Sequence, residues 1–272
     1  AQYKVTSFCA PPTAYRYLVQ LDMSKYDLSN LHYCTTAGEA LPIEVFNTFL
    51  KKTGLCLKEG YGQTELTLTI GNYPWMVARP GSMGKPAPGY DIDIVHPNGV
   101  SCTATEIGEI VIRVEKGRPF GMFAGYYRDQ ALTDKVFAGD IYHTGDTAWK
   151  DDDGYFWFVG RTDDLIKSAG YRISPFEVEN VLLQHPAVLE CAVTGVDDKA
   201  RNQVVKATII LAEGYKASKE LSIDIQSFAK HNSAAYKCPR IIEFVSELPK
   251  TISGKIRRVA IREKDRQAML QS

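Results

Sequence analysis

Gly160-Arg-Thr-Asp-Asp-Leu-Ile-Lys-Ser-Ala-Gly-Tyr-Arg-Ile-Ser-Pro-Phe-Glu-Val-Glu179 is the stretch at which one structural unit of this chain gives way to another. Its first part is polar and includes two adjacent carboxylates that begin at Asp163. Its second part predicts a helix start, because Ser174 is a preferred N-cap, Pro175 suits the first helical position and Glu177 completes a capping box. Taken alone, the stretch is typical of a connector between domains that leads into a well-capped helix.

The apolar pattern before this stretch predicts an α/β portion followed by a β-rich portion. Residues 1–83 alternate strand-like and helix-like segments, with helices expected at 13–21 and 42–52, and they indicate the end of a larger α/β sheet domain. Residues 84–162 change to a period of two with intervening turn signals, which predicts a β-rich, barrel-like subdomain. We therefore expect 1–162 to be the C-terminal portion of one large domain.

The pattern after the connector predicts a second, small α+β domain at 163–272. Its expected elements, in chain order, are a helix at 174–185, strands at 187–195 and 203–212, a helix at 218–231, a strand at 240–246 and a basic tail. With 272 residues, the chain is long enough for two domains that each bury a core.

The charge balance argues against a nucleic-acid partner. Lys plus Arg and Asp plus Glu number 32 each, so no overall field attracts a polyanion. From Arg161 onward 18 cations face 14 anions, and residues 250–266 hold seven cations and two anions. This basic segment suits either an anionic cosubstrate or a solvated surface, and no aromatic residue lies among its cations to stack on a base. No apolar run approaches the ~18 residues of a membrane span.

The cysteine and histidine patterns predict free thiols and no zinc site. The six cysteines are scattered without a C-x-x-C pair, which is typical of reduced thiols in a reducing, cytoplasmic compartment. The five histidines are also dispersed along the sequence, so we expect no zinc site. His143 is expected to be a packing residue, because no neighbour in the sequence offers it a partner.

Three further motifs have alternative interpretations when each is taken alone. Tyr61-Gly-Gln-Thr-Glu65 is expected in a loop after a strand, and it fits either a nucleotide contact with a hard carboxylate for Mg²⁺ or an ordinary β-turn. Tyr142-His-Thr-Gly-Asp146 is expected to end a strand in a turn with a surface carboxylate. Pro249-Lys-Thr-Ile-Ser-Gly-Lys255 puts a lysine on a glycine-containing turn, where exposed lysines are common.

Together, these motifs and the connector resemble the adenylate-forming enzymes, which include acyl-CoA synthetases, peptide-synthetase adenylation domains and luciferases. Their order and spacing match the family, and the resemblance to medium-chain acyl-CoA synthetases extends over nearly the whole chain. It implies an ATP-dependent, AMP-forming acyl-CoA synthetase, with ATP, Mg²⁺, CoA and a small carboxylic acid as ligands. The large domain would then be the AMP-binding domain and 163–272 a mobile C-terminal domain with its hinge at Asp163.

The resemblance also implies a nucleotide site. Asp146 would accept bonds from the ribose hydroxyls, which are charge-assisted and therefore strong; Arg161 would add a ribose contact, Arg172 would face the phosphate, and Glu65 would hold Mg²⁺. The implied ATP/AMP contacts are Gly38, Glu39, Glu59, Gly60, Tyr61, Gly62, Gln63, Thr64, Asp146, Arg161, Arg172 and Lys255.

Lys255 is the implied catalytic cation, together with Glu65. When a carboxylate attacks the α-phosphate of ATP, two anions meet and negative charge builds on phosphorus. A preorganised ammonium at this point is worth roughly 10²–10³ in rate, by analogy with oxyanion-hole donors. The position in the motif assigns this role to Lys255 and not to Lys250.

A site for CoA follows from the same resemblance, carried over position by position. The implied contacts are Ala169, Gly170, Tyr171, Arg201, Lys230, Cys238, Pro239 and Arg240. The three cations in this set suit an ADP-like tail, although they also fit a solvated surface. Cys238 is expected to be a wall contact and not a nucleophile.

Two features bear on the substrate and on the extent of the chain. Acetate-specific members of the family carry Trp at the position of Gly62, so an acid longer than acetate, of medium-chain or aromatic type, is expected. The family's phosphate loop is not found, which leads us to expect a fragment that is inactive alone. The alternatives are a carrier-protein-dependent adenylation domain and a degenerate binding domain. Turnover with free CoA discriminates the acyl-CoA synthetase from the carrier-dependent domain, and the sequence leaves the oligomeric state open.

Overall fold

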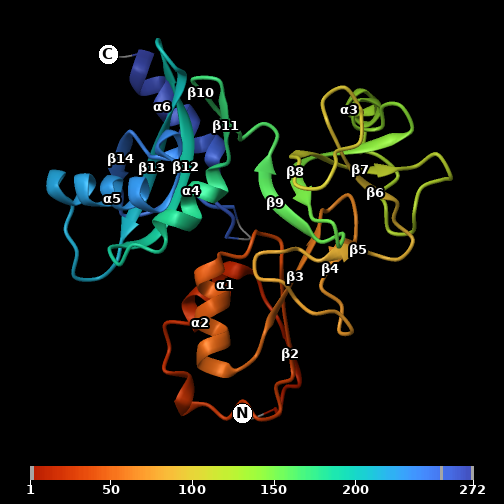
Figure 1. Cartoon of the computed structure of the whole chain (residues 1–272), viewed down its shortest axis with the longest axis horizontal. Helices are drawn as coiled ribbons and strands as arrows, with labels where there is room; N and C mark the ends of the chain where they lie inside the picture. Colours follow the sequence, from red (N-terminus) through yellow and green to blue (C-terminus); the bar gives the residue numbers. More distant parts are fainter. Residues whose placement is uncertain (1–2, 252–253, 271–272) are drawn as a thin grey trace. The chain divides into compact units, whose positions relative to one another are not determined.

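The computed structural model describes residues 3–251 and 254–270, and the chain divides into two compact units, Ala1–Thr162 and Asp163–Ser272. Figure 1 colours the first unit from red to green and the second from green to blue. No helix within the described ranges is both long enough and apolar enough to cross a membrane.

The first unit begins with a mixed five-stranded sheet. Its strands, in spatial order, are β1 (Ser7–Cys9), β2 (Tyr33–Ala37), β3 (Leu57–Gly62), β4 (Leu68–Gly71) and β5 (Lys85–Pro86). The first three are parallel, and β4 and β5 continue the sheet antiparallel. Parallel neighbours need a crossover, and α1 (Pro12–Leu18), a short 3₁₀ helix (Met23–Lys25) and α2 (Ile43–Thr53) supply it.

The two crossover helices pack together against this sheet. Tyr15 of α1 and Phe49 of α2 meet edge to face, with ring centroids 5.2 Å apart, above the buried strand residues Cys34 and Leu57. The second helix ends because Gly54 adopts φ 72°, and its N–H bonds back to Leu50. Both helices were predicted close to their observed limits.

The second part of this unit is an antiparallel meander of four strands. Its strands pair in chain order: β6 (Ile92–Val95), β7 (Gly108–Arg113), β8 (Ile141–Lys150) and β9 (Phe156–Arg161), with α3 (Gln130–Val136) before β8. At the β9 edge the pairing continues, because Gly84, just before β5, forms an antiparallel bridge to Phe156 of β9. The β-rich subdomain expected from the sequence is therefore present, and this bridge joins it to the first sheet. A turn at Asp152-Asp153 joins β8 to β9.

One apolar core joins the two sheets of the first unit. Tyr61, Ile70 and Met83 from the first sheet and its following loop share a buried cluster with Ile110 of β7 and Phe156 of β9. Ser82 fixes the junction, because its hydroxyl donates to the Phe156 carbonyl at 2.9 Å. The segment around Tyr61 is therefore held from both sheets.

The second unit is built on a sheet with β13 at its centre. Its elements are β10 (Ile166–Ser168), β11 (Tyr171–Ile173), α4 (Pro175–Leu182), β12 (Val188–Asp198), β13 (Asn202–Leu211), α5 (Lys219–Asn232), a 3₁₀ helix (Ala235–Lys237), β14 (Ile241–Phe244) and α6 (Arg258–Leu270). Strand β13 pairs antiparallel with β12 and β10, and parallel with β14. The predicted N-cap is confirmed, since Ser174 Oγ accepts the Glu177 N–H at 3.2 Å.

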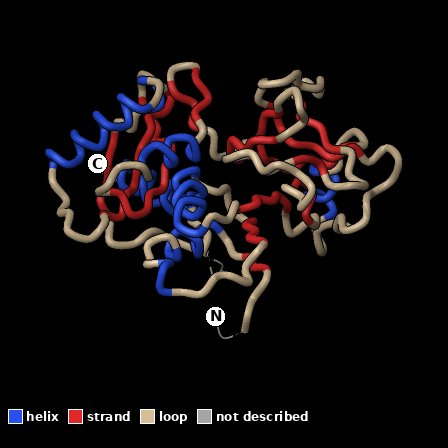
Figure 2. Tube along the Cα trace, turned by 60° about the horizontal axis from the view of Figure 1, so that its bottom comes forward, coloured by secondary structure: helices blue, strands red, loops and turns tan. Residues whose placement is uncertain are grey.

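Alternation along the strands assigns the helices to opposite faces of this sheet. Cys191 and Val193 of β12 lie in one cluster with residues of α4 and α5, whereas Ala192 between them packs against Ile261 of α6. Successive strand residues point to opposite faces, so the sheet is covered on both sides. Figure 2 shows these helices, in blue, around the red strands.

Helix α6 corrects the expectation of a basic tail. The segment from Arg258 was predicted to carry solvated or ligand-facing cations, but two of them bind carboxylates of their own unit. Arg258 Nη2 is 2.7 Å from Glu179 Oε2, and Arg262 pairs with Asp164. Charged residues at helical spacing around Ile261 hid a helix that packs through one apolar stripe.

Candidate active site

The ends of β2 and β3 bring two groups of predicted nucleotide contacts side by side, Gly38-Glu39 after β2 and Glu59–Thr64 in and after β3. The strands run parallel with Ala37 opposite Gly60, so residues that follow either strand emerge at one edge. Carboxyl edges of parallel strands are where α/β sheets bind ligands. Gly38 turns the chain there with φ 93°, and the carboxylate of Glu39 accepts a 2.7 Å bond from the Thr13 hydroxyl.

Tyr61 lies inside β3 and not in a loop, which corrects the first expectation for its motif. Its side chain is buried, and its hydroxyl donates to Asp146 Oδ2 at 2.6 Å. Burial, and next the charge of Asp146, raise the pKa of Tyr61. The strand continues this far because residues 57–62 keep strict alternation of buried and half-buried positions despite two glycines.

The backbone explains the glycine at position 62 in a way that the sequence interpretation did not include. A Cβ at this position would lie 2.3 Å from the carbonyl oxygen of Thr67, which is backbone and has no room to move. Gly60 is also crowded, with the Leu68 side chain at 2.5 Å from the same hypothetical atom. This backbone therefore needs glycine at position 62 independently of the size of the acid.

Gln63 ties its own motif to β8. Its amide nitrogen donates to the Thr144 carbonyl at 2.9 Å and to Asp146 Oδ2 at 2.6 Å. Its amide oxygen accepts the Tyr142 hydroxyl at 3.0 Å. The family resemblance placed Gln63 beside AMP but did not indicate this network. In the network, Gln63 holds the Asp146 carboxylate, for which a ribose contact was predicted.

Asp146 lies within β8, which corrects the expectation that its motif ends the strand. The strand passes through this motif with a bulge, because its register to β7 shifts between Glu109 and Val111. Gly145 makes the bulge possible with φ 70°, and its N–H bonds to Glu109 Oε1 at 2.9 Å. A bulge re-aims the side chain that follows it, and Asp146 is buried as a result.

His143 has a partner from the neighbouring strand, contrary to the sequence expectation. Its Nδ1 lies 3.0 Å from Glu109 Oε2, and the other oxygen of the same carboxylate holds the Gly145 bulge. The contact spans 34 positions, so nothing close in the sequence indicated it. His143 supports the bulge and through it the position of Asp146.

Arg161 pairs directly with Asp146 across β8 and β9. One guanidinium nitrogen is 3.6 Å from Asp146 Oδ1, and the arginine side chain is 47% exposed. The two predicted ribose contacts are therefore adjacent, with the carboxylate inside and the cation at the surface. The guanidinium also lies over Gly145, where a Cβ would come within 3.0 Å of it.

Glu65, the last residue of the Tyr61–Glu65 motif, lies in a position that fits a hard cation. Its Oε1 accepts the Tyr126 hydroxyl at 2.9 Å, and its backbone carbonyl accepts the Phe123 N–H at 2.8 Å. Within the part of the chain that the structure describes, Oε2 has no hydrogen-bond partner. Carboxylate oxygens are ligands that Mg²⁺ accepts, so this group fits the metal. Thr64, before it, is exposed.

Glu59 is a buried carboxyl group beneath the same edge. Burial raises the pKa of Glu59 to about 8, and the hydrogen bond from the Leu41 N–H, at 3.2 Å, acts in the opposite direction. The side chain is only 6% exposed. Its carboxyl therefore supports the segment after β2 from below rather than presenting a charge to a ligand.

The second unit holds the remaining residues that were predicted to contact the nucleotide, Arg172 and Lys255. Both side chains are exposed, and Arg172 lies opposite Lys167 in the β10–β11 pair. The Lys255 N–H bonds to Thr251 Oγ1 at 3.1 Å. Lys250 differs, because its ammonium is 2.8 Å from the buried carboxylate of Glu190. Ile252 and Ser253 of this motif lie outside the described residues.

The predicted CoA residues gather on the second unit around two turns and a tyrosine pair. Ala169 and Gly170 form the β10–β11 turn with φ of 48° and 86°, and the Ala169 N–H bonds to the Arg201 carbonyl at 2.9 Å. Tyr171 stacks on Tyr236, with centroids 4.1 Å apart and planes 12° from parallel. Sequence reasoning missed Tyr236, although it lies two positions before the Cys238 motif.

The other members of this set include Cys238 and the residues next to it in sequence. Burial raises the pKa of this thiol, and the charges of Lys230 and Arg240 act in the opposite direction. Its Sγ donates to the Gln226 carbonyl at 3.3 Å, and Pro239 is buried while both cations are exposed. A protonated, half-buried thiol fits the expectation that Cys238 is a wall contact.

Comparison with known proteins places this architecture among the AMP-binding enzymes. The profile described as AMP-binding enzyme matches residues 1–127, and the profile of the AMP-binding enzyme C-terminal domain matches residues 177–255. Acyl-coenzyme A synthetase ACSM3 of Mus musculus, named as mitochondrial, is 47% identical over 267 residues, which are 97% of this chain and 46% of the relative. The 4-hydroxybutyrate–CoA ligase 1 of Metallosphaera sedula is 49% identical over 262 residues, or 96% of this chain and 46% of the relative.

Solved structures of CoA ligases share the fold. The anthranilate CoA ligase AuaEII in complex with anthranoyl-AMP superposes with a TM-score of 0.88 at 39% identity, over 99% of this chain and 50% of that one. A benzoate CoA ligase from Burkholderia xenovorans gives 0.83 at 33% identity, over 96% and 52%. The chain therefore spans about half the length of the curated relatives and solved structures that it matches.

Proposed function

Because the chain belongs to the family of AMP-binding enzymes, as its motifs predicted, we propose that it is part of an ATP-dependent, AMP-forming acyl-CoA ligase. It supplies the residues that bind the ribose, the catalytic lysine and the residues that bind CoA. The observation that carries this proposal is the Asp146 carboxylate. Tyr61 and Gln63 both donate to its Oδ2 at 2.6 Å, and Arg161 lies 3.6 Å from its Oδ1. A fixed anion beside a surface cation suits a ribose diol.

The first half-reaction joins the acid to AMP. A carboxylate oxygen attacks the α-phosphorus of ATP, the bond from that phosphorus to pyrophosphate breaks, and acyl-AMP remains. Lys255 neutralises the charge that builds as the two anions meet, and Arg172 binds the phosphate. Glu65 would hold Mg²⁺, which neutralises phosphate charge when it is bound. The exposure of Lys255 and the ion pair of Lys250 with Glu190 support this division of roles.

The second half-reaction transfers the acyl group to CoA. The thiol attacks the acyl carbonyl and loses its proton, and the bond to AMP breaks to give the thioester. Exposed Arg201, Lys230 and Arg240 would bind the phosphates of the ADP-like tail. The stacked pair of Tyr171 and Tyr236 offers a flat face to the adenine, and base–aromatic stacking is worth about 1–3 kcal/mol.

A change of orientation between the two half-reactions would take place at Asp163. The first compact unit ends at Thr162 and the second begins at Asp163, and hinges absorb large changes in φ and ψ at a few connector residues. The unit from Asp163 onward would be the mobile C-terminal domain, and the unit before it part of the AMP-binding domain.

The acid is larger than acetate in this proposal. The relatives are named for 4-hydroxybutyrate, anthranilate and benzoate, which are small carboxylates of aliphatic and aromatic type. Gly62 supports this only weakly, because its backbone contact with Thr67 already requires glycine. The six cysteines are free thiols, which fits a reducing compartment such as the cytoplasm, and the ACSM3 relative is named as mitochondrial.

The ribose assignment is tested by ATP–pyrophosphate exchange with Asp146→Asn in the full-length protein. This change keeps an acceptor for Tyr61 and removes the charge, so the KM for ATP should rise about tenfold, the loss of one charge-assisted bond of roughly 1.5 kcal/mol. Asp152→Ala, at an exposed turn, is the matched control and should exchange normally. An unchanged KM in Asp146→Asn refutes the ribose role.

A further inference from the structure

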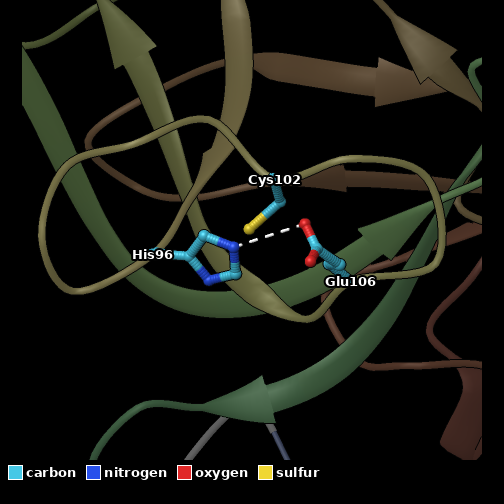
Figure 3. A group of neighbouring side chains, drawn as sticks. All are labelled: His96, Cys102 and Glu106. Atoms are coloured by element: carbon cyan, nitrogen blue, oxygen red, sulfur yellow. Dashed lines mark hydrogen bonds and ion pairs between the residues drawn. The ribbon is translucent and has the colours of Figure 1, made fainter.

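The loop between β6 and β7 brings three different donor side chains to one point of the first unit. One donor atom each of His96, Cys102 and Glu106 lies within 4.8 Å of the other two, and His96 Nε2 is 3.3 Å from Glu106 Oε2. Figure 3 shows the sulfur, the imidazole and the carboxylate directed toward one another. We propose that these side chains form a binding site for a divalent zinc-class ion.

The distances between the three donor atoms are close to the donor–donor distances around a bound zinc ion. Zinc binds sulfur at about 2.3 Å, and imidazole nitrogen and carboxylate oxygen at about 2.0–2.2 Å, usually in a tetrahedron. Donors in such a tetrahedron are about 3.3–3.7 Å apart, by the geometry of those bond lengths. The His96–Glu106 distance already matches, and the Cys102 distances, which are at most 4.8 Å, exceed the tetrahedral range by about 1 Å at most.

Backbone hydrogen bonds hold the three donors in place. The Cys102 N–H bonds to the Ile94 carbonyl at 2.7 Å, and the His96 N–H bonds to the Val100 carbonyl at 2.8 Å, so both residues extend the hairpin ladder. The Thr103 N–H donates to Glu106 Oε2 at 2.7 Å. Such a bond to a ligating carboxylate fixes its orientation, as outer-shell partners do in metal sites.

The chemistry of the set favours zinc over magnesium or calcium. A sulfur and an imidazole are poor ligands for the hard cations, which prefer oxygen, but both suit zinc. One thiolate and one carboxylate balance the charge of a divalent ion, with the imidazole neutral. Cys102 forms the buried floor, while the His96 and Glu106 side chains are 35% and 46% exposed, so water can occupy a fourth position from outside.

The site lies apart from the proposed catalytic groups but touches the same core. Cys102 belongs to the buried cluster that contains Tyr61 and Ile94. A bound ion would therefore connect the loop to the core of the first unit and raise its thermal stability. None of the three donors is among the residues that we assign to ATP, CoA or the acid.

To test this proposal, the full-length, metal-free protein is titrated with zinc, and Co²⁺ is then substituted for zinc. We expect one zinc per chain, a rise in Tm on binding, and a thiolate-to-cobalt absorption band. His96→Gln and Glu106→Gln, both at half-exposed positions, should each weaken zinc binding at least tenfold, which is the smallest loss typical of changes at metal sites. His32→Gln and Cys9→Ser, both exposed, are matched controls and should bind normally.

Cys102→Ser should abolish the cobalt band. If this variant unfolds because Cys102 is buried, the two half-exposed variants decide the question. A protein that binds no zinc at roughly 100 µM, a far weaker affinity than structural sites show, contradicts the proposal. Binding that survives both His96→Gln and Glu106→Gln, or a cobalt complex without a thiolate band, also contradicts it.

Discussion

The Tyr61 hydroxyl and the Asp146 carboxylate form a 2.6 Å hydrogen bond between residues 85 positions apart. Tyr61 comes from the first sheet and Asp146 from the second, so the bond connects two motifs of the first unit. Both side chains are buried, and a hydrogen bond to a charged group in such surroundings is worth about 1.5–3 kcal/mol. The carboxylate assigned to the ribose thus has an orientation set before any ligand binds.

Tyr61→Phe removes this bond without changing the ring. The free energy of unfolding should fall by about 1–3 kcal/mol, because Asp146 keeps Gln63 but loses one buried donor, and the KM for ATP should rise with it. Urea denaturation and ATP–pyrophosphate exchange measure the two effects. Tyr17→Phe, at a residue 60% exposed, is the control. A variant as stable as the wild type would show that the bond contributes nothing.

Glu59 predicts a pH dependence of stability. Its pKa is raised from 4.5 to about 8 by burial, so between these values the folded protein holds a proton that the unfolded chain releases. Folding is therefore favoured at the acid end, and this contribution is lost as pH rises from 4.5 to about 8.

Glu59→Gln should remove that dependence, because glutamine keeps an acceptor for the Leu41 N–H and does not titrate. Urea denaturation at about pH 5 and about pH 8 measures this. The free energy of unfolding of the variant, relative to that of the wild type, should be higher at about pH 8 than at about pH 5. A difference between the two proteins that is the same at both pH values would place the charged form of Glu59 in a better-solvated position.

Alanine variants of Lys255 and Lys250 should have different effects, one on the rate of adenylate formation and the other on stability. Lys255→Ala should lower adenylate formation by roughly 10²–10³, spare thioester formation from supplied acyl-AMP, and leave unfolding unchanged, since its side chain is exposed. Lys250→Ala leaves the buried Glu190 carboxylate without this cation and should cost about 1–3 kcal/mol with little change in rate. Single-turnover kinetics and urea denaturation of both variants decide. The reverse pattern would move the catalytic role to Lys250.

Arg201→Ala and Arg240→Ala should each raise the KM for CoA roughly two- to fivefold, which is the range expected for an exposed ion pair. The KM for ATP should stay constant, and the penalty should shrink as salt is added. Lys216→Ala removes an exposed cation from the loop before α5 and serves as the control. Should both arginine variants keep the wild-type KM for CoA, as the control does, these arginines are only surface charges.

Asp163→Pro tests the hinge. Proline fixes φ near −65°, so a residue that must change φ between half-reactions would be trapped in one orientation. One half-reaction should fail and the other should survive, whereas Asp163→Ala should run both. Normal rates of both half-reactions in the proline variant would place the pivot elsewhere.

Local signals in the sequence predicted most of the fold. The α2 helix, the Ser174 cap and strands β12, β13 and β14 follow from short-range periodicity and capping, and the structure has them, whereas the short strands β10 and β11 were not predicted. Helix α6 was missed because seven of its thirteen residues, Arg258–Leu270, are charged or amide-bearing, and its apolar stripe is visible only against β12. The end of β3 was misplaced because glycines at 60 and 62 mimic a loop.

The candidate site was predicted by resemblance, and its internal contacts were not. Nothing in the sequence indicated that Gln63 binds Thr144 or that Glu109 reaches His143, because both contacts depend on the register of strands far apart. The His96, Cys102 and Glu106 group was missed for a related reason. A single histidine in a hairpin loop matches no zinc spacing until the loop is folded.

The products of one reaction test the central claim most directly. The full-length protein is incubated with ATP, Mg²⁺, free CoA and a medium-chain or aromatic acid, and the phosphorus species are followed by ³¹P NMR beside thioester formation. AMP-forming ligation predicts AMP, pyrophosphate and acyl-CoA in equal amounts, all dependent on the acid. ADP and phosphate as products, or AMP formation that needs a carrier protein in place of free CoA, would contradict it.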